Sequence, residues 1–116
     1  IAAMLIYEVN LEVKEEAKFG FAGWLPDHID KILKCEGFKA AQWFFRNHEE
    51  EGKDPDGSQL WTIQYIVEDQ KSLDNYLKNH AEKMRKEALD KFGDKFSASR
   101  RVLHLLSVAG DFGQLE

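Results

Sequence analysis

The spacing of apolar residues changes along the chain, and the order of these changes is the feature that most restricts the fold. Apolar and polar residues alternate from Met4 to Val13, a period of two that is typical of a β-strand. Spacings of three and four follow from residue 15 to residue 36, and again from residue 70 to residue 92, which indicates two helices with one apolar face each. Strand-like patterns return at residues 38–46, 60–69 and 96–106.

The predicted order of strand, helix, strand, strand, helix, strand is that of a ferredoxin-like, or split βαβ, fold. Right-handed crossovers then place both helices on one face of a four-stranded antiparallel sheet, with the first and third strands in its centre. The chain has 116 residues, the usual size of one domain. We therefore predict one α+β domain of βαββαβ topology over residues 4–106. Residues 1–3 are expected to be a leader or a cloning remnant, and residues 107–116 a C-terminal tail.

Two local features interrupt this pattern. Pro26 falls within the first helix, where it removes a hydrogen-bond donor and crowds the preceding turn, so we expect a kink or a restart of the helix there. Residues 48–58 are polar and contain Asp54-Pro55 and Asp56-Gly57, which is turn chemistry. We expect them to form a long loop between antiparallel strands. Asp69 precedes the second helix and is expected to cap it.

The two faces of the predicted sheet differ in character. The more apolar face is expected to lie under the helices, with the opposite assignment of the two faces as the alternative; it contains Leu5, Tyr7, Val9, Trp61, Ile63 and Tyr65. The other face mixes polar and apolar side chains, which suits a self-complementary interface. Its predicted members are Ile6, Glu8, Asn10, Gln42, Phe44, Thr62, Gln64, Ile66, Arg100 and Val102. We predict a homodimer through this face, with Glu8, Gln64 and Arg100 in a polar network, because two-fold symmetry needs only one such patch.

Charge and cysteine content exclude several classes of function. The chain has 21 acidic and 16 basic residues and a net charge of −5, which argues against nucleic acid or an anionic membrane as a partner. The sequence has no apolar run long enough for a membrane span. Its single cysteine, Cys35, allows no internal disulfide and fits a reducing compartment. A cytoplasmic location is therefore predicted.

Several short motifs occur in a fixed order along the chain. They are Met-Leu-Ile-Tyr-Glu-Val-Asn at 4–10, Trp24-Leu25 with His28, Gly37-Phe38, Gln64-Tyr65, Tyr76-Leu77, Asn79-His80-Ala81, Arg85, Phe92-Gly93 and Phe-Ser-Ala-Ser-Arg-Arg-Val-Leu at 96–103. Together they resemble a family of small bacterial proteins classified only as a domain of unknown function. The match covers residues 4–103, and its closing Arg-Arg-Val-Leu segment is the most specific part. Pro26 and the acidic loop at 48–58 depart from the family.

That family in turn resembles the dimeric α/β-barrel group, whose members pair ferredoxin-like sheets. The group includes cofactor-free monooxygenases, haem-degrading enzymes and binding proteins, so the resemblance implies a fold and a dimer but no single activity. Haem-degrading members use an asparagine on the first strand with an aromatic residue and a histidine on the second helix. Asn10, Tyr76 and His80 resemble that set in part, since Tyr76 stands where a tryptophan is expected and His80 follows one turn later.

We place the candidate pocket between the sheet and the second helix, with Asn10, Tyr76 and His80, and with His28 from the first helix. His28 and His80 lie on the apolar stripes of the two helices. They are either ligands of a shared metal site or partly buried structural histidines. A metal usually takes three or four ligands at fixed spacing, and the sequence contains no such cluster. We expect neither a metal nor a cofactor.

The basic residues near the end of the second helix also have two interpretations. They form either a solvated face that complements the helix dipole or an anion site. These residues are Lys83, Arg85, Lys86 and Lys91. The leading hypothesis for the whole chain is a homodimeric interaction protein, or a protein that binds a small apolar or aromatic ligand. The alternative is a cofactor-free monooxygenase-like or haem-degrading enzyme of the dimeric α/β-barrel group.

Overall fold

Four strands form one antiparallel sheet in the order β2-β3-β1-β4. Their bounds are β1 Leu5–Val13, β2 Phe38–Arg46, β3 Gln59–Val67 and β4 Phe96–His104. This computed structural model describes residues 4–111. The leader expected at 1–3 and the end of the expected tail, 112–116, lie outside the described residues. The first and third strands occupy the centre of the sheet, as the sequence predicts.

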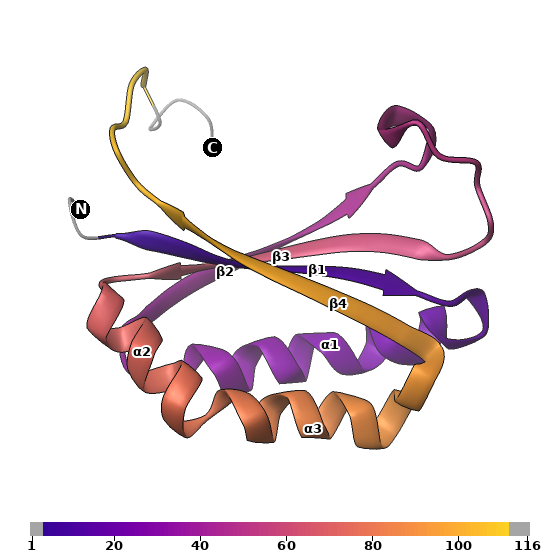
Figure 1. Ribbon diagram of the computed structural model, residues 1–116, viewed down its shortest axis with the longest axis horizontal. Helices are drawn as coiled ribbons and strands as arrows, with labels where there is room; N and C mark the ends of the chain where they lie inside the picture. Colours follow the sequence, from indigo (N-terminus) through magenta and orange to yellow (C-terminus); the bar gives the residue numbers. More distant parts are fainter. Residues whose placement is uncertain (1–3, 112–116) are drawn as a thin grey trace.

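The described residues form three α-helices. These helices cover one face of the sheet, and the other face is open (Figure 1). Their bounds are α1 Lys18–Leu33, α2 Gln70–Asn79 and α3 Ala81–Phe92. The described residues also contain three short 3-10 helices, η1 Glu15–Ala17, η2 Glu49–Glu51 and η3 Gly93–Lys95. The β2–β3 hairpin and the chain after β4 rise on the open side, away from the helices (Figure 1). The architecture is the predicted α+β, ferredoxin-like one.

The core lies between the sheet and the helices, on the face that alternation predicts. Leu5, Tyr7 and Leu11 of β1 are buried there, together with Ile63 and Tyr65 of β3. Truncating a fully buried side chain of this kind to alanine generally costs about 2–5 kcal/mol. This layer therefore fixes which face of each central strand the helices must cover.

The orientation of β4 corrects the sequence prediction. Arg100 pairs with Val9 of β1, whereas Arg101 pairs with Glu8. Arg100 and Val102 therefore face the helices, and Arg101 takes the open-face position that we had assigned to Arg100. The alternation in Ser-Ala-Ser-Arg-Arg is weak, and a shift of one residue moves every side chain to the opposite face.

The first helix differs from expectation at Pro26. α1 runs without interruption from Lys18 to Leu33 with Pro26 inside it, so the expected restart is wrong. The Pro26 ring is exposed to solvent. The helix can therefore continue through this residue. The missing backbone donor remains a cost in stability.

The second helical segment is two helices rather than one. His80 separates α2 from α3 with φ −129° and ψ −30°, which lies outside the helical region. The break changes the direction of the chain (Figure 1), so that α2 packs on β3 and α3 packs beside α1. The expected cap is confirmed, because the Asp69 carboxylate accepts a hydrogen bond of 2.8 Å from the Ser72 N–H.

Candidate functional site

A cavity of about 290 Å³ lies between the sheet and the helices. Its walls come from β1, β3 and β4 on one side and from α1, α2 and α3 on the other. Aromatic rings form much of the lining, namely Tyr7, Phe21, Trp24, Tyr65, Tyr76 and Phe96. Because the volume is near the lower end of the range for small-molecule sites, it suits a ligand of one or two rings.

Arg85 of α3 brings a positive charge to the cavity wall. Its Nη2 group donates a hydrogen bond of 3.1 Å to Tyr7 Oη. Its Nε atom is buried and has no hydrogen-bond partner among the described residues. A buried donor without an acceptor is costly, so a ligand oxygen at this position would satisfy it.

His28 of α1 lines the same cavity. Its ring stacks on Trp24 with ring centroids 4.4 Å apart. Its Nδ1 atom is buried and has no hydrogen bond to any residue from 4 to 111, and Glu87 Oε2 lies 3.9 Å from it. Burial lowers the pKa of His28, and the charge of Glu87 only partly opposes that effect. The imidazole is therefore neutral at pH 7 and free to accept or donate a hydrogen bond.

Three tyrosines meet in the cavity wall. The Tyr7 ring centroid lies 6.2 Å from that of Tyr65 and 5.7 Å from that of Tyr76. Burial raises the pKa of Tyr65 and of Tyr76, and the positive charge of Arg100 acts against that rise. Both side chains are neutral phenols at pH 7, so they offer aromatic surface and hydroxyl groups rather than a phenolate base.

The structure brings two of the four predicted pocket residues to this cavity. Tyr76 and His28 line it. Asn10 lies on the opposite, open face of the sheet, where its Oδ1 accepts a hydrogen bond of 2.6 Å from Thr62 Oγ1. His80 is half-buried at the junction of α2 and α3, with its ring centroid 6.4 Å from that of Tyr76, and it is absent from the lining.

The set that resembles haem-degrading enzymes is therefore not assembled around one cavity. Neighbouring side chains of a strand point to opposite faces of the sheet, and the parity of Asn10 is opposite to that of Tyr7. The resemblance to haem-degrading enzymes predicts Asn10 in the pocket, whereas the alternation along β1 predicts it on the open face, and the structure agrees with the alternation.

Among the lining residues that were not predicted for the pocket, Arg85 and Arg100 are the two arginines. A signal for Arg85 was present, since it follows the buried Ala81 by four residues and precedes the buried Ala88 by three. This spacing places it on the inner face of the helix. It belonged to the group of basic residues for which an anion site was the alternative interpretation.

On the open face of the sheet, Glu8 is the centre of a polar network. Its carboxylate accepts hydrogen bonds of 2.9 Å from Asn10 Nδ2, 2.9 Å from Gln64 Nε2 and 2.5 Å from Arg101 Nε. The Glu8 side chain is 3% exposed, whereas that of Arg101 is 64% exposed. The predicted network of Glu8, Gln64 and Arg100 thus forms with Arg101 in place of Arg100.

Burial opposes ionisation of Glu8, but the three donors outweigh it. Arg101, Asn10 and Gln64 together lower the pKa of Glu8 from 4.5 to about 2. Glu8 is therefore a buried carboxylate whose charge is compensated within one sheet, as the cost of burying an unpaired charge requires.

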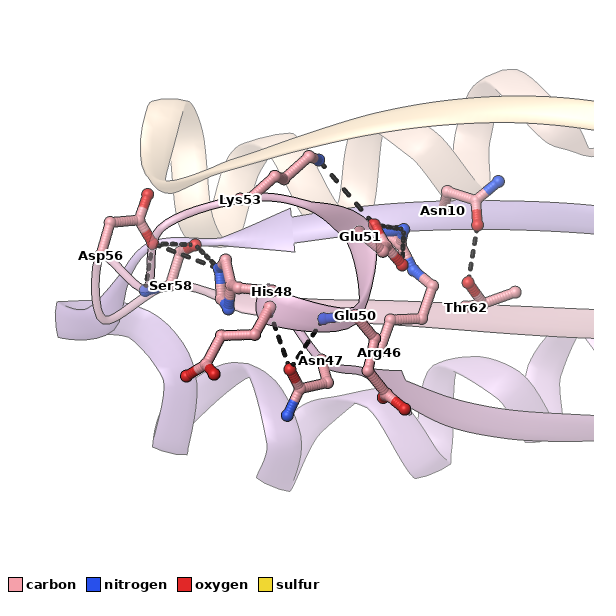
Figure 2. Close-up of polar contacts among 11 residues, drawn as sticks. Asn10, Arg46, Asn47, His48, Glu50, Glu51, Lys53, Asp56, Ser58 and Thr62 are labelled. Carbon is pink, nitrogen blue, oxygen red and sulfur yellow. Dashed lines mark hydrogen bonds and ion pairs between the residues drawn. The ribbon is translucent and has the colours of Figure 1, made fainter.

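The β2–β3 hairpin overhangs a broad groove of about 820 Å³ on this open face. Polar contacts hold the hairpin together (Figure 2): Arg46 Nη1 lies 3.2 Å from Glu51 Oε1, and His48 Nε2 lies 3.3 Å from Asp56 Oδ1. Glu8, Asn10 and Phe44 lie in the groove with the hairpin residues Arg46, Glu51 and Lys53. The open face is thus hollowed and mixed in character rather than uniformly polar.

The described residues offer neither a metal-binding cluster nor a membrane-spanning helix. Across residues 4–111, no three His, Cys, Asp or Glu side chains lie close enough together to hold a metal ion. Among the helices of that range, none has the length and apolar character needed to cross a membrane.

Solved structures with low sequence identity share this fold. SnoaB from Streptomyces nogalater, a cofactor-independent oxygenase, matches with a TM-score of 0.66 at 10% identity over 95% of this chain and 100% of that chain. A conserved protein from Methanosarcina mazei Go1 matches with a TM-score of 0.63 at 19% identity over 89% and 93% of the two chains. MupZ from Pseudomonas fluorescens matches with a TM-score of 0.62 at 14% identity over 88% and 68%.

The sequence comparisons confirm the resemblance carried by the motifs. No curated protein sequence matches the chain. A family model described as a domain of unknown function, DUF4286, matches residues 4–106. Because that match covers most of the chain, this protein belongs to the DUF4286 family.

Proposed function

We propose that this protein binds a small apolar or aromatic ligand in the cavity between its sheet and helices, and that it does so as a homodimer. The observation that carries the proposal is the cavity itself, which holds about 290 Å³ of space inside the core layer. Well-packed cores leave few voids larger than a water molecule. A void of this size, lined by aromatic rings and a few polar groups, has the composition of a ligand site.

The binding proposal is tested with a neutral fluorescent probe, N-phenyl-1-naphthylamine, whose emission rises in apolar surroundings. Leu89 lines the cavity and is also exposed, so it lies at the cavity mouth. Leu89→Trp should block entry and reduce the emission rise at least tenfold. Leu77→Trp is the matched control, since Leu77 is an exposed helical leucine outside the lining. Equal probe binding by both variants would contradict the proposal.

A second candidate function is cofactor-free oxygenation of the bound ligand. SnoaB, which shares the fold, is a cofactor-independent oxygenase, and the neutral His28 imidazole on the cavity wall is suited to take a proton from a bound substrate. Oxygen uptake measured with aromatic compounds that bind the cavity tests this candidate. Uptake that is lost in His28→Gln, with binding unchanged, would favour the enzyme over the binding protein.

The dimer is proposed to form through the open face of the sheet. Phe44 of β2 lies there, half exposed, and pairs with the polar Thr62 of β3, while Arg101 lies on the same face at the opposite edge of the sheet. Apolar groups among polar ones are typical of an interface core and rim. Phe44→Glu should convert the dimer to a monomer in light scattering coupled to gel filtration, whereas Phe19→Glu, at an exposed site on α1, should not. A wild-type monomer at micromolar concentration would refute the dimer.

A cytoplasmic location belongs to the same proposal. It is supported by the single cysteine, Cys35, which leaves the fold independent of disulfide formation.

A further inference from the structure

The four arginines of the chain fall into two groups. Arg46 and Arg101 lie on the open-face side of the sheet, and each forms an ion pair with a glutamate. Arg85 and Arg100 line the cavity, and neither forms an ion pair with any residue in the range 4–111. The two cavity arginines therefore differ from the others in having no anionic partner among residues 4–111.

The cavity also has no acidic side chain in its lining. This is notable in a chain with a net charge of −5. Glu87 lies nearby but outside the lining, where it contacts Lys31 Nζ at 3.4 Å. The lining thus contains two arginines and no acidic side chain, in a protein whose net charge is negative.

The two guanidinium groups are arranged to meet a ligand from different elements. Arg85 projects from α3, where Tyr7 Oη accepts one of its N–H groups and its buried Nε finds no acceptor in the described part of the chain. Arg100 comes from the edge strand β4 and is exposed. One charge therefore lies partly within the cavity wall, and the other lies where the cavity meets solvent.

We propose that the natural ligand of this cavity is an aromatic carboxylate, with its acid bound by Arg85 and Arg100 and its ring among Tyr7, Tyr65 and Tyr76. The inference rests on the proposed binding function and deepens it by naming the ligand class. A guanidinium matches a carboxylate through parallel N–H donors, and the unpartnered Arg85 Nε supplies one such donor. The tyrosine rings supply the apolar surface that a ring of the ligand needs.

Isothermal titration calorimetry at pH 7 with two probes of one shape tests this inference. The probes are 1-naphthoate, which carries a carboxylate, and 1-naphthamide, its neutral counterpart. Wild-type protein should bind the carboxylate at least about tenfold more tightly, as hydrogen bonds to a charged group imply. Arg85→Gln and Arg100→Gln should each reduce that preference, and the double variant should abolish it.

The matched control is Lys83→Gln, which removes one positive charge from the exposed surface of α3 outside the cavity lining. It should leave the preference unchanged. Arg100 is exposed, so Arg100→Gln keeps the test valid even where Arg85→Gln fails to fold.

The outcomes separate the inference from the binding function beneath it. Equal affinity for the two probes overturns the ligand class and leaves the binding function standing. A preference that survives in the double variant, or that Lys83→Gln also removes, overturns the role of the two arginines. Failure of wild-type protein to bind either probe counts against both the ligand class and the binding function.

Discussion

The buried carboxylate of Glu8 makes the stability of this protein depend on pH in a defined direction. Its pKa is about 2 in the folded protein, against 4.5 for an ordinary glutamate. A depressed pKa adds stability that is fully present above pH 4.5 and is lost as the pH falls toward 2. The difference in pKa corresponds to about 3 kcal/mol at 1.36 kcal/mol for each pH unit.

The contribution measured in solution should be about 2–3 kcal/mol, because solvent screens the exposed guanidinium of Arg101. Urea unfolding of wild type and Glu8→Gln at pH 6, 4 and 2 measures it. Protein concentration is held constant, since a dimer makes the apparent stability depend on concentration. The stability gap between the two proteins should narrow by about 2–3 kcal/mol from pH 6 to pH 2.

The matched control is Glu12→Gln on the same strand. Glu12 is exposed and forms no ion pair with a described residue, so its variant should follow the wild-type pH dependence. A gap between wild type and Glu8→Gln that stays constant over the same pH range would refute the assignment of a strongly depressed pKa to Glu8.

Four further substitutions test local features by urea unfolding. Pro26→Ala should raise the free energy of unfolding by about 2 kcal/mol, because alanine restores a donor inside α1; no gain would mean that the helix does not continue through residue 26. Gly37→Ala should cost about 2–4 kcal/mol, since φ is +82° and the new Cβ would lie 2.0 Å from Ser72 Oγ. Gly52→Ala, with φ +73° and open space around it, should cost clearly less, and equal losses would contradict the proposed clash. Asp69→Ala should lower the unfolding midpoint through loss of the α2 cap, and an unchanged midpoint would show that the cap contributes nothing.

The sequence correctly predicts the buried face of the central strands, because apolar and polar residues alternate most clearly there. The alternation of Leu5, Tyr7 and Leu11 with polar residues identifies the buried face of β1 correctly, and the same holds for Ile63 and Tyr65 on β3. These residues lie in central strands, where only one face can meet the helices. The element order and strand order follow from this signal and from the handedness of the crossovers.

Where the signal is weak or depends on tertiary packing, prediction fails. β4 is an edge strand with two consecutive arginines, so charge does not say which of Arg100 and Arg101 faces inward. The helix break at His80 has no glycine or proline to mark it, and it is set by how α2 and α3 pack on different elements. Pro26 is tolerated within a helix because its ring faces solvent.

The candidate site is predicted in part for the same reasons. Tyr76 and His28 lie on helical apolar stripes and therefore reach the cavity. Asn10 does not, because its parity on β1 places it on the open face. The cavity itself is a property of side chains from six elements, and no local pattern in the sequence encodes it.

The most direct test of the central claim, that the cavity is a ligand site, uses the two methionines of the chain. Met84 lines the cavity, whereas Met4 precedes β1 and is absent from the lining. With ¹³C-labelled methionine methyl groups, an aromatic probe such as 1-naphthoate should shift the Met84 resonance through its ring current and leave the Met4 resonance in place. A saturating probe that shifts Met4 as much as Met84, or that shifts neither, would contradict binding in this cavity.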